Sequence, residues 1–369
     1  MPKLYFAVFI AIAISVYTAM HGFVYWRLAS GLSLTSGPRL ALKLLLIAGA
    51  LTFVAAEFLS RLTPLYPLLY VGSLWLGALA IALAVFLPEL VLSLLFPHQR
   101  RLFVLAALTV VFLISAFSVL NVALGPVLRQ VKIPVRGLAA DLEGFTIVQL
   151  SDLHLGNLTS ARQLSRIVER VNALKPDLIC VTGDVLDGDI CRDEGYCKIL
   201  DDLQARYGVV AVTGNHEFYA GIEKFLKLAE LSNWRVLRNQ VWSLDGKLDI
   251  VGLDDDAGKS FKFSGPDLSG TLRSAAPNVP KILLYHRPAG FPEAVKQGID
   301  LQLSGHTHAG QIPPMDFLVR LIYKYPSGLY RLGQSHIYTS SGTGTWGPPM
   351  RFLSRSEIVK LMLVRTKSM

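Results

Sequence analysis

The run GHTHAGQ at residues 305–311 sets two histidines two positions apart among small residues, a spacing that lets a strand-end loop aim imidazoles at metal ions. Four related pieces come earlier, each where an apolar, β-branched run stops and a polar loop begins. They are Asp152-Leu153-His154, Gly183-Asp184, Gly214-Asn215-His216-Glu217 and the single His286. Together the five pieces predict a hydrolytic site built around two metal ions.

The candidate metal ligands are oxygen and imidazole donors from loops spread over about 150 positions. Open α/β sheets bind their ligands where such loops meet, at the carboxyl ends of the strands. We expect Asp184 to bridge two ions, with one carboxylate oxygen on each. One ion would be held by Asp152, His154 and His308, and the other by Asn215, His286 and His306.

Carboxylate, amide and imidazole donors without a thiolate favour Mn²⁺, Fe or Zn²⁺ as the cofactor over Cu(I) or an iron–sulfur cluster. Two cations about 3.5–4 Å apart would lower the pKa of a bridging water and clamp phosphate oxygens during in-line attack. His216 follows Asn215 directly, so it would be free to donate a proton to the leaving oxygen or to stabilise transition-state charge. His216 is therefore the predicted catalytic residue.

Each piece taken alone has a plainer explanation. Residues 214–217 could form a turn with a capped helix, and His286 alone would more often be a core histidine. Their occurrence together, in order and at sensible spacing, favours the metal site. Asp187 has two equally plausible roles: its side chain could form a hydrogen bond that supports the site, or the residue could belong to a turn. The acidic run at 254–256 indicates a capping or solvated loop, with a third cation site as the alternative.

The elements that must position these residues follow an α/β pattern from about Lys132 onward. Asp245-Gly246 between two apolar runs predicts a hairpin. A cap at Thr159-Ser160 and a stop at Pro176 delimit one amphipathic helix, and two more are expected at 197–204 and 222–231. The expected strands are 146–150, 178–182, 209–213, 241–244, 248–253, 282–285, 301–304, 337–340 and 358–364.

At these residues the sequence resembles the calcineurin-like metallophosphoesterases, whose pattern is D-x-H, G-D, G-N-H-[DE], H and G-H-x-H in this order. Several segments look like the membrane-associated bacterial branch of this family, the YaeI/YkuE-like phosphoesterases. The segments that carry this likeness are 178–187, 212–217, 305–311, 328–331, 341–344 and 347–351.

The resemblance spans about residues 145–364, and all seven ligand positions and His216 match it. It implies phosphoester hydrolysis and a four-layer α/β sandwich, with two mixed sheets flanked by helices. Ala309 and Ser356 depart from the pattern. Neither is a ligand position, so these departures bear on loop shape and substrate choice.

The first third of the chain has a different composition. The whole chain of 369 residues is 52% hydrophobic with a mean hydropathy of +0.43, too apolar for one soluble domain. Residues 1–131 hold two acidic and eight basic residues, so much of the net charge of +9 flanks apolar segments. Lys/Arg residues beside apolar spans, without a basic stripe in the hydrophilic part, argue against a nucleic-acid partner and for a lipid bilayer.

Four segments are long enough to cross a bilayer core: 4–26, 40–59, 68–87 and 102–124. Pro88-Glu89 is expected to interrupt the third, with residues 90–96 lying along the membrane interface. Residues 1–131 thus form a predicted all-α transmembrane region of about four helices, and residues 132–369 a metallophosphoesterase domain.

The membrane side of that domain stays open. Lys and Arg flank the spans in equal numbers on both sides, but three charges after the first helix, Arg27, Arg39 and Lys43, favour an extracytoplasmic domain. Cys191 and Cys197 lie six apart in a polar loop, where a disulfide could close in an oxidising compartment, whereas Cys180 fits a buried strand. We predict a multi-pass protein of the cell inner membrane.

Residues 315–325 bear on the substrate. Their apolar side chains alternate with Arg320 and Lys324, a composition suited to an interfacial helix, with a core-facing helix as the alternative. The favoured function is hydrolysis of a phosphodiester, phosphomonoester or pyrophosphate of a membrane-associated, possibly lipid-linked, substrate. One alternative is a cytoplasm-facing pyrophosphatase of the UDP-2,3-diacylglucosamine type. Another is a non-enzymatic membrane receptor, which a lost ligand would favour, and no ligand position is lost.

Overall fold

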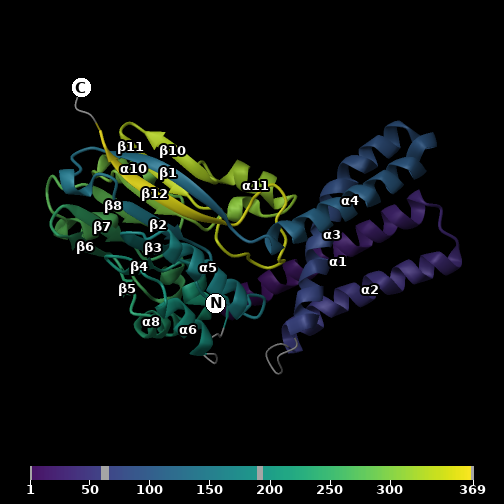
Figure 1. The fold of residues 1–369 in the computed structure, drawn as a ribbon. Helices are drawn as coiled ribbons and strands as arrows, with labels where there is room; N and C mark the ends of the chain where they lie inside the picture. Colours follow the sequence, from purple (N-terminus) through teal and green to yellow (C-terminus); the bar gives the residue numbers. More distant parts are fainter. Residues whose placement is uncertain (1, 60–65, 189–193, 367–369) are drawn as a thin grey trace. The chain divides into compact units, whose positions relative to one another are not determined.

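The computed structural model describes residues 2–59, 66–188 and 194–366, which divide into two compact units (Figure 1). The helical unit consists of Met1–Ala123, Ile312–Asp316 and Gly347–Leu353. The sheet unit consists of Leu124–Gln311, Phe317–Trp346 and Ser354–Met369. The division of the chain at residue 131 stays a prediction.

The helical unit is built from four long helices. They are α1 (Pro2–Gly31), α2 (Ser36–Leu59), α3 (Tyr66–Leu95) and α4 (Arg100–Ala123), with the short 3₁₀ helix η1 (Pro97–Gln99) before the last. Among the described residues, three stretches are long and apolar enough to cross a membrane: Ser36–Leu59, Tyr66–Leu95 and Pro97–Ala123. A helix also forms at the first expected span, but several of its side chains lie outside the described set, so that crossing stays a prediction.

The expected interruption of the third span is wrong, because α3 runs through Pro88 without a break. Proline removes one backbone hydrogen bond from a helix, and neighbouring helices make this tolerable in membrane segments. Close packing supports α3 elsewhere: a Cβ on Gly72 would lie 2.8 Å from the Cα of Phe53 in α2. Residues 90–95 therefore continue the helix.

Two segments from late in the chain belong to the core of the helical unit. Ile312 and Met350 are buried in one cluster with Ile81 of α3. The backbone of Arg351 is fixed by α4, since its N–H donates to the Ser118 carbonyl at 3.0 Å and its carbonyl accepts from Asn121 Nδ2 at 2.9 Å.

The helical unit also buries an ion pair. Arg27 of α1 contacts Glu89 of α3 at 2.8 Å, and both side chains are at most 4% exposed. A second guanidinium nitrogen, Nε, donates to the same carboxylate at 3.1 Å, and the Ser93 hydroxyl donates to it as well. The pair is thus bidentate and its charges neutralise each other.

The sheet unit contains two six-stranded mixed sheets, as expected. The first has the order β1-β12-β2-β3-β4-β5 and the second β10-β11-β9-β8-β7-β6. The strands of the first sheet are β1 (Val127–Val135), β2 (Thr146–Leu150), β3 (Leu178–Thr182), β4 (Val209–Val212), β5 (Arg235–Val236) and β12 (Glu357–Arg365). Those of the second are β6 (Gln240–Leu244), β7 (Leu248–Gly252), β8 (Lys281–Leu284), β9 (Leu301–Ser304), β10 (Gly328–Leu332) and β11 (Ser335–Thr339).

Two main cores hold these layers together. Apolar side chains of both sheets, including Ile147, Val210, Ile282 and Leu303, are buried in one cluster between them. A second cluster packs the outer face of the first sheet against α5 (Ala161–Ala173), α6 (Glu194–Asp201) and α8 (Ile222–Leu231). The near-continuous apolar runs of β2, β3 and β4 follow from burial on both faces.

Most expected elements form where the sequence indicates. Ser160 caps α5 through a complete capping box with Gln163, as its position predicted. The helix expected at 197–204 lies three residues earlier, at Glu194–Asp201, and β1, β5 and β10 were not expected. Cys180 is buried in β3 as expected, whereas Cys191 lies outside the described residues, so its disulfide with Cys197 stays a prediction.

Shorter helices complete the unit: α7 (Asn215–Ala220), α9 (Leu268–Thr271), α10 (Phe291–Lys296) and α11 (Met315–Ile322), with the 3₁₀ turns η2 (Ala140–Leu142), η3 (Asp256–Phe261), η4 (Leu272–Ser274) and η5 (His308–Gly310). The chain passes from the helical to the sheet unit within α11. Phe317, Leu318, Leu321 and Ile322 of α11 are 39–71% exposed, and Val319 is 7% exposed. The core-facing alternative for this helix is therefore wrong.

Candidate metal centre

Every expected ligand lies just beyond the carboxyl end of a strand. Asp152 and His154 follow β2, Asp184 follows β3, and Asn215 begins α7 after β4. The second sheet contributes the others: His286 follows β8, and His306 and His308 follow β9. The parallel pairing of β2–β3–β4 and of β8–β9 brings these ends to a common edge within each sheet.

The loops adopt strained backbone conformations. Five of the seven candidate ligands have φ in the left-handed region, between 45° and 73°: Asp152, His154, Asp184, His306 and His308. Non-glycine residues rarely adopt such angles, and the strain concentrates at functional sites. Gly214 and Gly305 are required nearby, because a Cβ would overlap the Asp184 carboxylate at the first and Ser151 at the second.

One set of donors consists of Asp152, His154 and His308, as expected. His154 Nε2 and His308 Nε2 are 3.1 Å apart, and His308 Nε2 is 3.4 Å from Asp152 Oδ1. All three residues are buried, and one donor atom from each lies within 4.8 Å of the others. Two imidazole nitrogens facing each other beside a carboxylate form the arrangement that a cation needs.

A second set consists of Asp184, His286 and His306. His286 Nε2 is 3.1 Å from Asp184 Oδ2 and 3.2 Å from His306 Nδ1. Asp184 Oδ2 also faces the first set, at 3.8 Å from His154 Nε2, while its Oδ1 accepts the backbone N–H of His216 at 2.9 Å. Asp184 thus lies between the sets, but it faces both through the same oxygen and not through one oxygen each.

Asn215, the seventh expected ligand, immediately precedes His216. Asn215 Oδ1 and His154 Nδ1 are buried and have no hydrogen-bond partner among the residues that the structure describes. A buried polar atom without a partner is unfavourable unless something else binds it, and an amide oxygen is a good cation ligand. The donor set therefore fits divalent cations.

Two of the ligand imidazoles, His154 and His306, are held in the neutral state that binds metals, whereas burial would lower the pKa of His286 but the charge of Asp184 raises it to about 10. His286 Nδ1 lies 2.8 Å from the Thr182 carbonyl, which orients the ring and leaves Nε2 facing Asp184. Burial lowers the pKa of His154 to about 4 and that of His306 to about 3. Both rings are thus neutral at neutral pH, and neutral imidazole is the ligand form.

Glu217 connects two of the ligand loops. Its buried carboxylate accepts the backbone N–H groups of Asp184 at 2.8 Å, Leu186 at 3.1 Å and Gly214 at 2.6 Å. This role was not assigned from the sequence, where the last residue of the GNHE motif could equally have been a simple helix cap. Glu217 fixes the Asp184 loop against the start of α7.

His216, the predicted catalytic residue, lies beside the two sets. Its ring centroid lies 4.7 Å from that of His154, and its Nδ1 lies 3.3 Å from Asp187 Oδ1. Burial alone would lower the pKa of His216, but the hydrogen bond to Asp187 and the charges of Asp184 and Asp187 raise it above its ordinary value. Asp187 therefore contacts His216, as a residue that supports the site would.

The acidic run at 254–256 is used for ion pairing and capping. Asp254 pairs with Arg238 at 2.8 Å, and Asp255 pairs with Arg287 at 2.8 Å while also capping η3. Two of the three carboxylates are thus neutralised by arginines, which removes the case for a third cation there. The capping role expected from the sequence is confirmed.

Two aromatic residues near the centre carried no sequence signal. Tyr323, just after α11, places its hydroxyl 3.0 Å from His306 Nε2. Trp346 lies with its ring centroid 5.9 Å from that of His216 and is 54% exposed. Trp346 is far from His216 in the sequence, and Tyr323 lies outside the motif that contains His306, so no single motif indicated these contacts.

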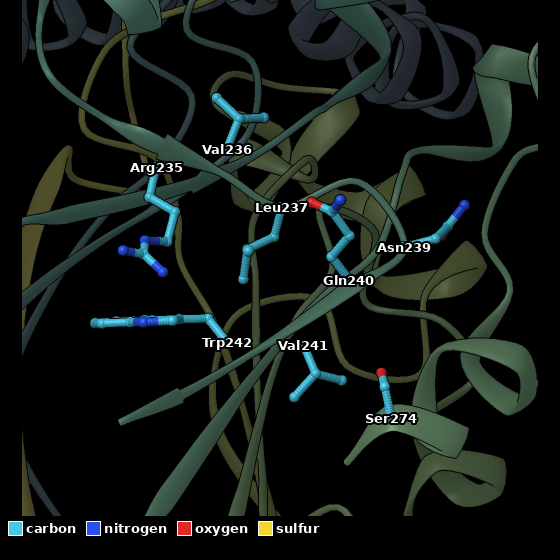
Figure 2. A pocket seen from close by; sticks show the side chains of 8 residues that line it. All are labelled: Arg235, Val236, Leu237, Asn239, Gln240, Val241, Trp242 and Ser274. Atoms are coloured by element: carbon cyan, nitrogen blue, oxygen red, sulfur yellow. The ribbon is translucent and has the colours of Figure 1, made fainter. Parts of the chain in front are cut away.

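A pocket elsewhere in the sheet unit holds none of these donors. It lies beside β5 and β6, where the Arg235 guanidinium stacks 4.5 Å over the Trp242 ring (Figure 2). We assign it no part in the chemistry, because the convergent carboxylates and imidazoles lie at the strand ends described above.

Two mixed sheets flanked by helices, with clustered imidazoles and carboxylates at their strand ends, define a fold of the metallohydrolase type. Sequence comparison specifies it: residues 145–310 match the family described as calcineurin-like phosphoesterase. The chain belongs to the calcineurin-like metallophosphoesterases.

Three relatives illustrate this membership. A Danio rerio transmembrane protein with metallophosphoesterase domain is 35% identical over 269 residues, 70% of this chain and 62% of that protein. An uncharacterized metallophosphoesterase of Campylobacter jejuni is 38% identical over 255 residues, 69% of this chain and 67% of that protein. The Bacillus subtilis metallophosphoesterase YkuE is 35% identical over 236 residues, 61% of this chain and 80% of that protein. The chain thus spans less than two thirds of the Danio rerio relative.

Proposed function

We propose that this chain is a membrane-anchored phosphoester hydrolase that works with two divalent cations. The observation that carries the proposal is the convergence of imidazole nitrogens and carboxylate oxygens around Asp184, beside the partnerless buried Oδ1 of Asn215. In the proposed assignment, Asp184 is shared by both ions. Asp152, His154 and His308 hold one ion, and Asn215, His286 and His306 hold the other.

When bound, Mn²⁺, Fe or Zn²⁺ ions would supply Lewis acidity for phosphate oxygens and lower the pKa of a water molecule. The residues of the chain set the geometry around that chemistry. Glu217 and the Thr182 carbonyl fix the loops and rings that carry the donors. His216, whose Nδ1 contacts the Asp187 carboxylate, gives its proton to the oxygen of the departing alcohol or phosphate.

Metal removal tests the chemistry. The full chain in detergent micelles, stripped with a chelator, should lose hydrolysis of p-nitrophenyl phosphate and of bis-p-nitrophenyl phosphate, and regain it on Mn²⁺ addition. Ion counting should give about two per chain at full activity. Full activity with fewer than about one ion per chain would overturn the proposal, and the preferred ester would separate monoesterase from diesterase action.

We further propose that the substrate is membrane-associated, as a lipid-linked phosphoester would be. Three apolar helices long enough to span a bilayer belong to the same chain. The segment Ile312–Asp316 belongs to the helical unit, and the first residues of α11 lie in that segment, so chain connectivity keeps α11 close to it. The exposed apolar face of α11 and the basic Arg320 suit a lipid interface.

Replacing Phe317, Leu318 and Leu321 by Ser tests this step. Hydrolysis of a soluble chromogenic ester should persist, whereas turnover of a phospholipid in vesicles should fall. The fall should be larger in vesicles of neutral lipids, because each basic residue adds about 1 kcal/mol of attraction to anionic headgroups only. Leu231→Ser on α8, which is 47% exposed, serves as the control and should change neither activity. Unchanged vesicle turnover in the triple variant would remove the membrane-substrate step.

We also propose that the chain resides in the cell inner membrane with its sheet unit outside the cytoplasm. The charges that follow the first helix support this side. A reporter fused after Met369, active only in one compartment, decides it. A cytoplasmic reporter signal would contradict the proposed side and restrict the substrate to molecules found there.

A further inference from the structure

Exposed aromatic rings stand beside the proposed proton donor. The ring centroid of His216 lies 5.5 Å from that of Tyr219 and 5.9 Å from that of Trp346. Tyr219 is 60% exposed and Trp346 54% exposed, although the metal ligand His154, 4.7 Å from His216, is buried. His216 is therefore where the buried donor cluster meets an exposed aromatic surface.

Trp346 is held in place by the ligand loop itself. The buried Gln311, which ends the GHTHAGQ run, donates from Nε2 to the Trp346 carbonyl at 2.9 Å, and its Oε1 accepts the Trp346 N–H at 3.1 Å. These two hydrogen bonds fix the Trp346 backbone relative to His308. A large apolar side chain is thus anchored through its backbone while it remains exposed, and aromatic residues of this kind are enriched at binding surfaces.

Tyr219 is fixed by a second route. It lies one turn after His216 on α7, so both side chains lie on the same side of that helix. Phe261, 44% exposed at the end of η3, packs against Tyr219 with centroids 6.0 Å apart. The start of η3 is capped by Asp255, which pairs with Arg287 next to the ligand His286.

We infer that Tyr219 and Trp346 bind the leaving group of the substrate, and that they select a leaving group with a flat, uncharged ring. The inference rests on the proposed function, because it takes His216 as the donor to the leaving oxygen. A group that receives a proton from His216 must lie within reach of both rings, given their distances. Stacking on an aromatic side chain suits any flat ring and contributes specificity without hydrogen bonds.

Two other chemistries fit less well. Aromatic rings also bind quaternary ammonium groups, but two divalent cations at the neighbouring site would repel a cationic leaving group. An acyl chain would gain from any apolar side chain and makes no use of the ring faces that Tyr219 and Trp346 place beside His216. A flat ring uses both the apolar area and the ring faces.

The test compares two phosphate esters whose alcohols are similarly acidic, phenyl phosphate and hexafluoroisopropyl phosphate. The full chain is assayed in micelles with Mn²⁺. Trp346→Leu, which keeps apolar area and loses the ring, should lower the phenyl to hexafluoroisopropyl ratio of kcat/KM by about 5- to 100-fold. Trp346→Phe should retain most of that ratio, and Tyr219→Leu should lower it in the same direction. Leu329→Ala on β10, exposed and apolar, is the control that should leave both esters unchanged.

Each outcome bears on the inference. If Trp346→Leu kept the phenyl to hexafluoroisopropyl ratio of kcat/KM, the site would select by general apolar contact and not by a ring, and the inference would be wrong. A preference for phosphocholine over phenyl phosphate would also overturn it, because the site would then select a cationic group. Equal losses for both esters would make the rings structural supports of His216. Absence of metal-dependent hydrolysis of either ester in the unaltered chain would instead refute the proposed function, so the two failures are distinguishable.

Discussion

Two of the buried clusters of charged side chains that the structure describes, one in each unit, differ in how their charges are balanced. In the helical unit, the Arg27 guanidinium and the Glu89 carboxylate form a bidentate pair that neutralises itself. In the sheet unit, Asp152 and Asp184 are fully or almost fully buried among imidazoles whose nitrogens converge on one another. The charges of the first cluster are balanced by its own residues, whereas the donor atoms of the second cluster are arranged to bind added cations.

The difference distinguishes charges that are buried to hold the fold together from charges that are buried to bind a ligand. A paired ion inside a helical bundle has its charge balanced by its partner and needs no added ion. Converging donors, left-handed backbone angles and a partnerless amide oxygen are all unfavourable for the protein alone. A protein retains such features where a ligand compensates for them.

The largest expected effect comes from removing the charge shared by both metal sets. Asp184→Asn should nearly abolish hydrolysis and reduce bound metal, because the bridge loses the negative charge that balances two cations. Ion counting and turnover of p-nitrophenyl phosphate after Mn²⁺ loading measure both quantities.

Asp249→Asn provides the matched control for this prediction. Asp249 is a buried carboxylate of the sheet unit that accepts the backbone N–H of Ala276 at 2.9 Å. The Asp249→Asn variant should bind as much metal, and turn over substrate as fast per folded chain, as the unaltered protein. If the two variants lost metal alike, the contrast between the clusters would reflect folding and not cation binding.

His216→Ala should keep both metals and lower turnover by about 10²- to 10⁴-fold, the usual loss for a general acid. A good leaving group such as p-nitrophenol needs little protonation, so its ester should lose less than an alkyl ester. Asp187→Asn, which removes only the partner of His216, should give a smaller loss of the same kind. Equal losses for both leaving groups would leave His216 an electrostatic role alone.

The donor cluster was predictable from sequence and its surroundings were not. Six of the seven candidate ligands belong to short motifs at the ends of apolar strands, and the order of these motifs along the chain also indicates the single His286. The His216–Asp187 contact, the Glu217 clamp and the ring of Trp346 depend on where distant loops meet, which one sequence does not encode locally. β1 was missed because its partner β12 lies some 230 residues away and four of its nine residues are exposed.

A smaller effect, on stability, should come from the neutralised cluster. Glu89→Leu leaves the Arg27 charge buried and should destabilise the helical unit by about 3–5 kcal/mol, the cost typical of breaking a buried pair. The double change with Arg27→Met should recover much of this loss. Thermal unfolding in micelles measures both. Metal content per folded chain should not change, and a loss of metal in Glu89→Leu would contradict the separation of the two clusters.

The smallest effect tests a single hydroxyl at the edge of the donor cluster. Tyr323 O–H lies 3.0 Å from His306 Nε2, while the Nδ1 of His306 faces His286. A hydrogen bond at Nε2 favours the tautomer in which Nδ1 is free to bind a cation. Tyr323→Phe keeps the ring and should weaken the binding of one Mn²⁺ by about 10-fold, with turnover restored at high Mn²⁺. Ser93→Ala, which removes a hydroxyl from the neutralised Glu89, is the counterpart and should leave Mn²⁺ binding unchanged. Equal Mn²⁺ affinity in both variants would show that Tyr323 only packs against His306, since a hydroxyl that positions a ligand must alter the affinity for the ion.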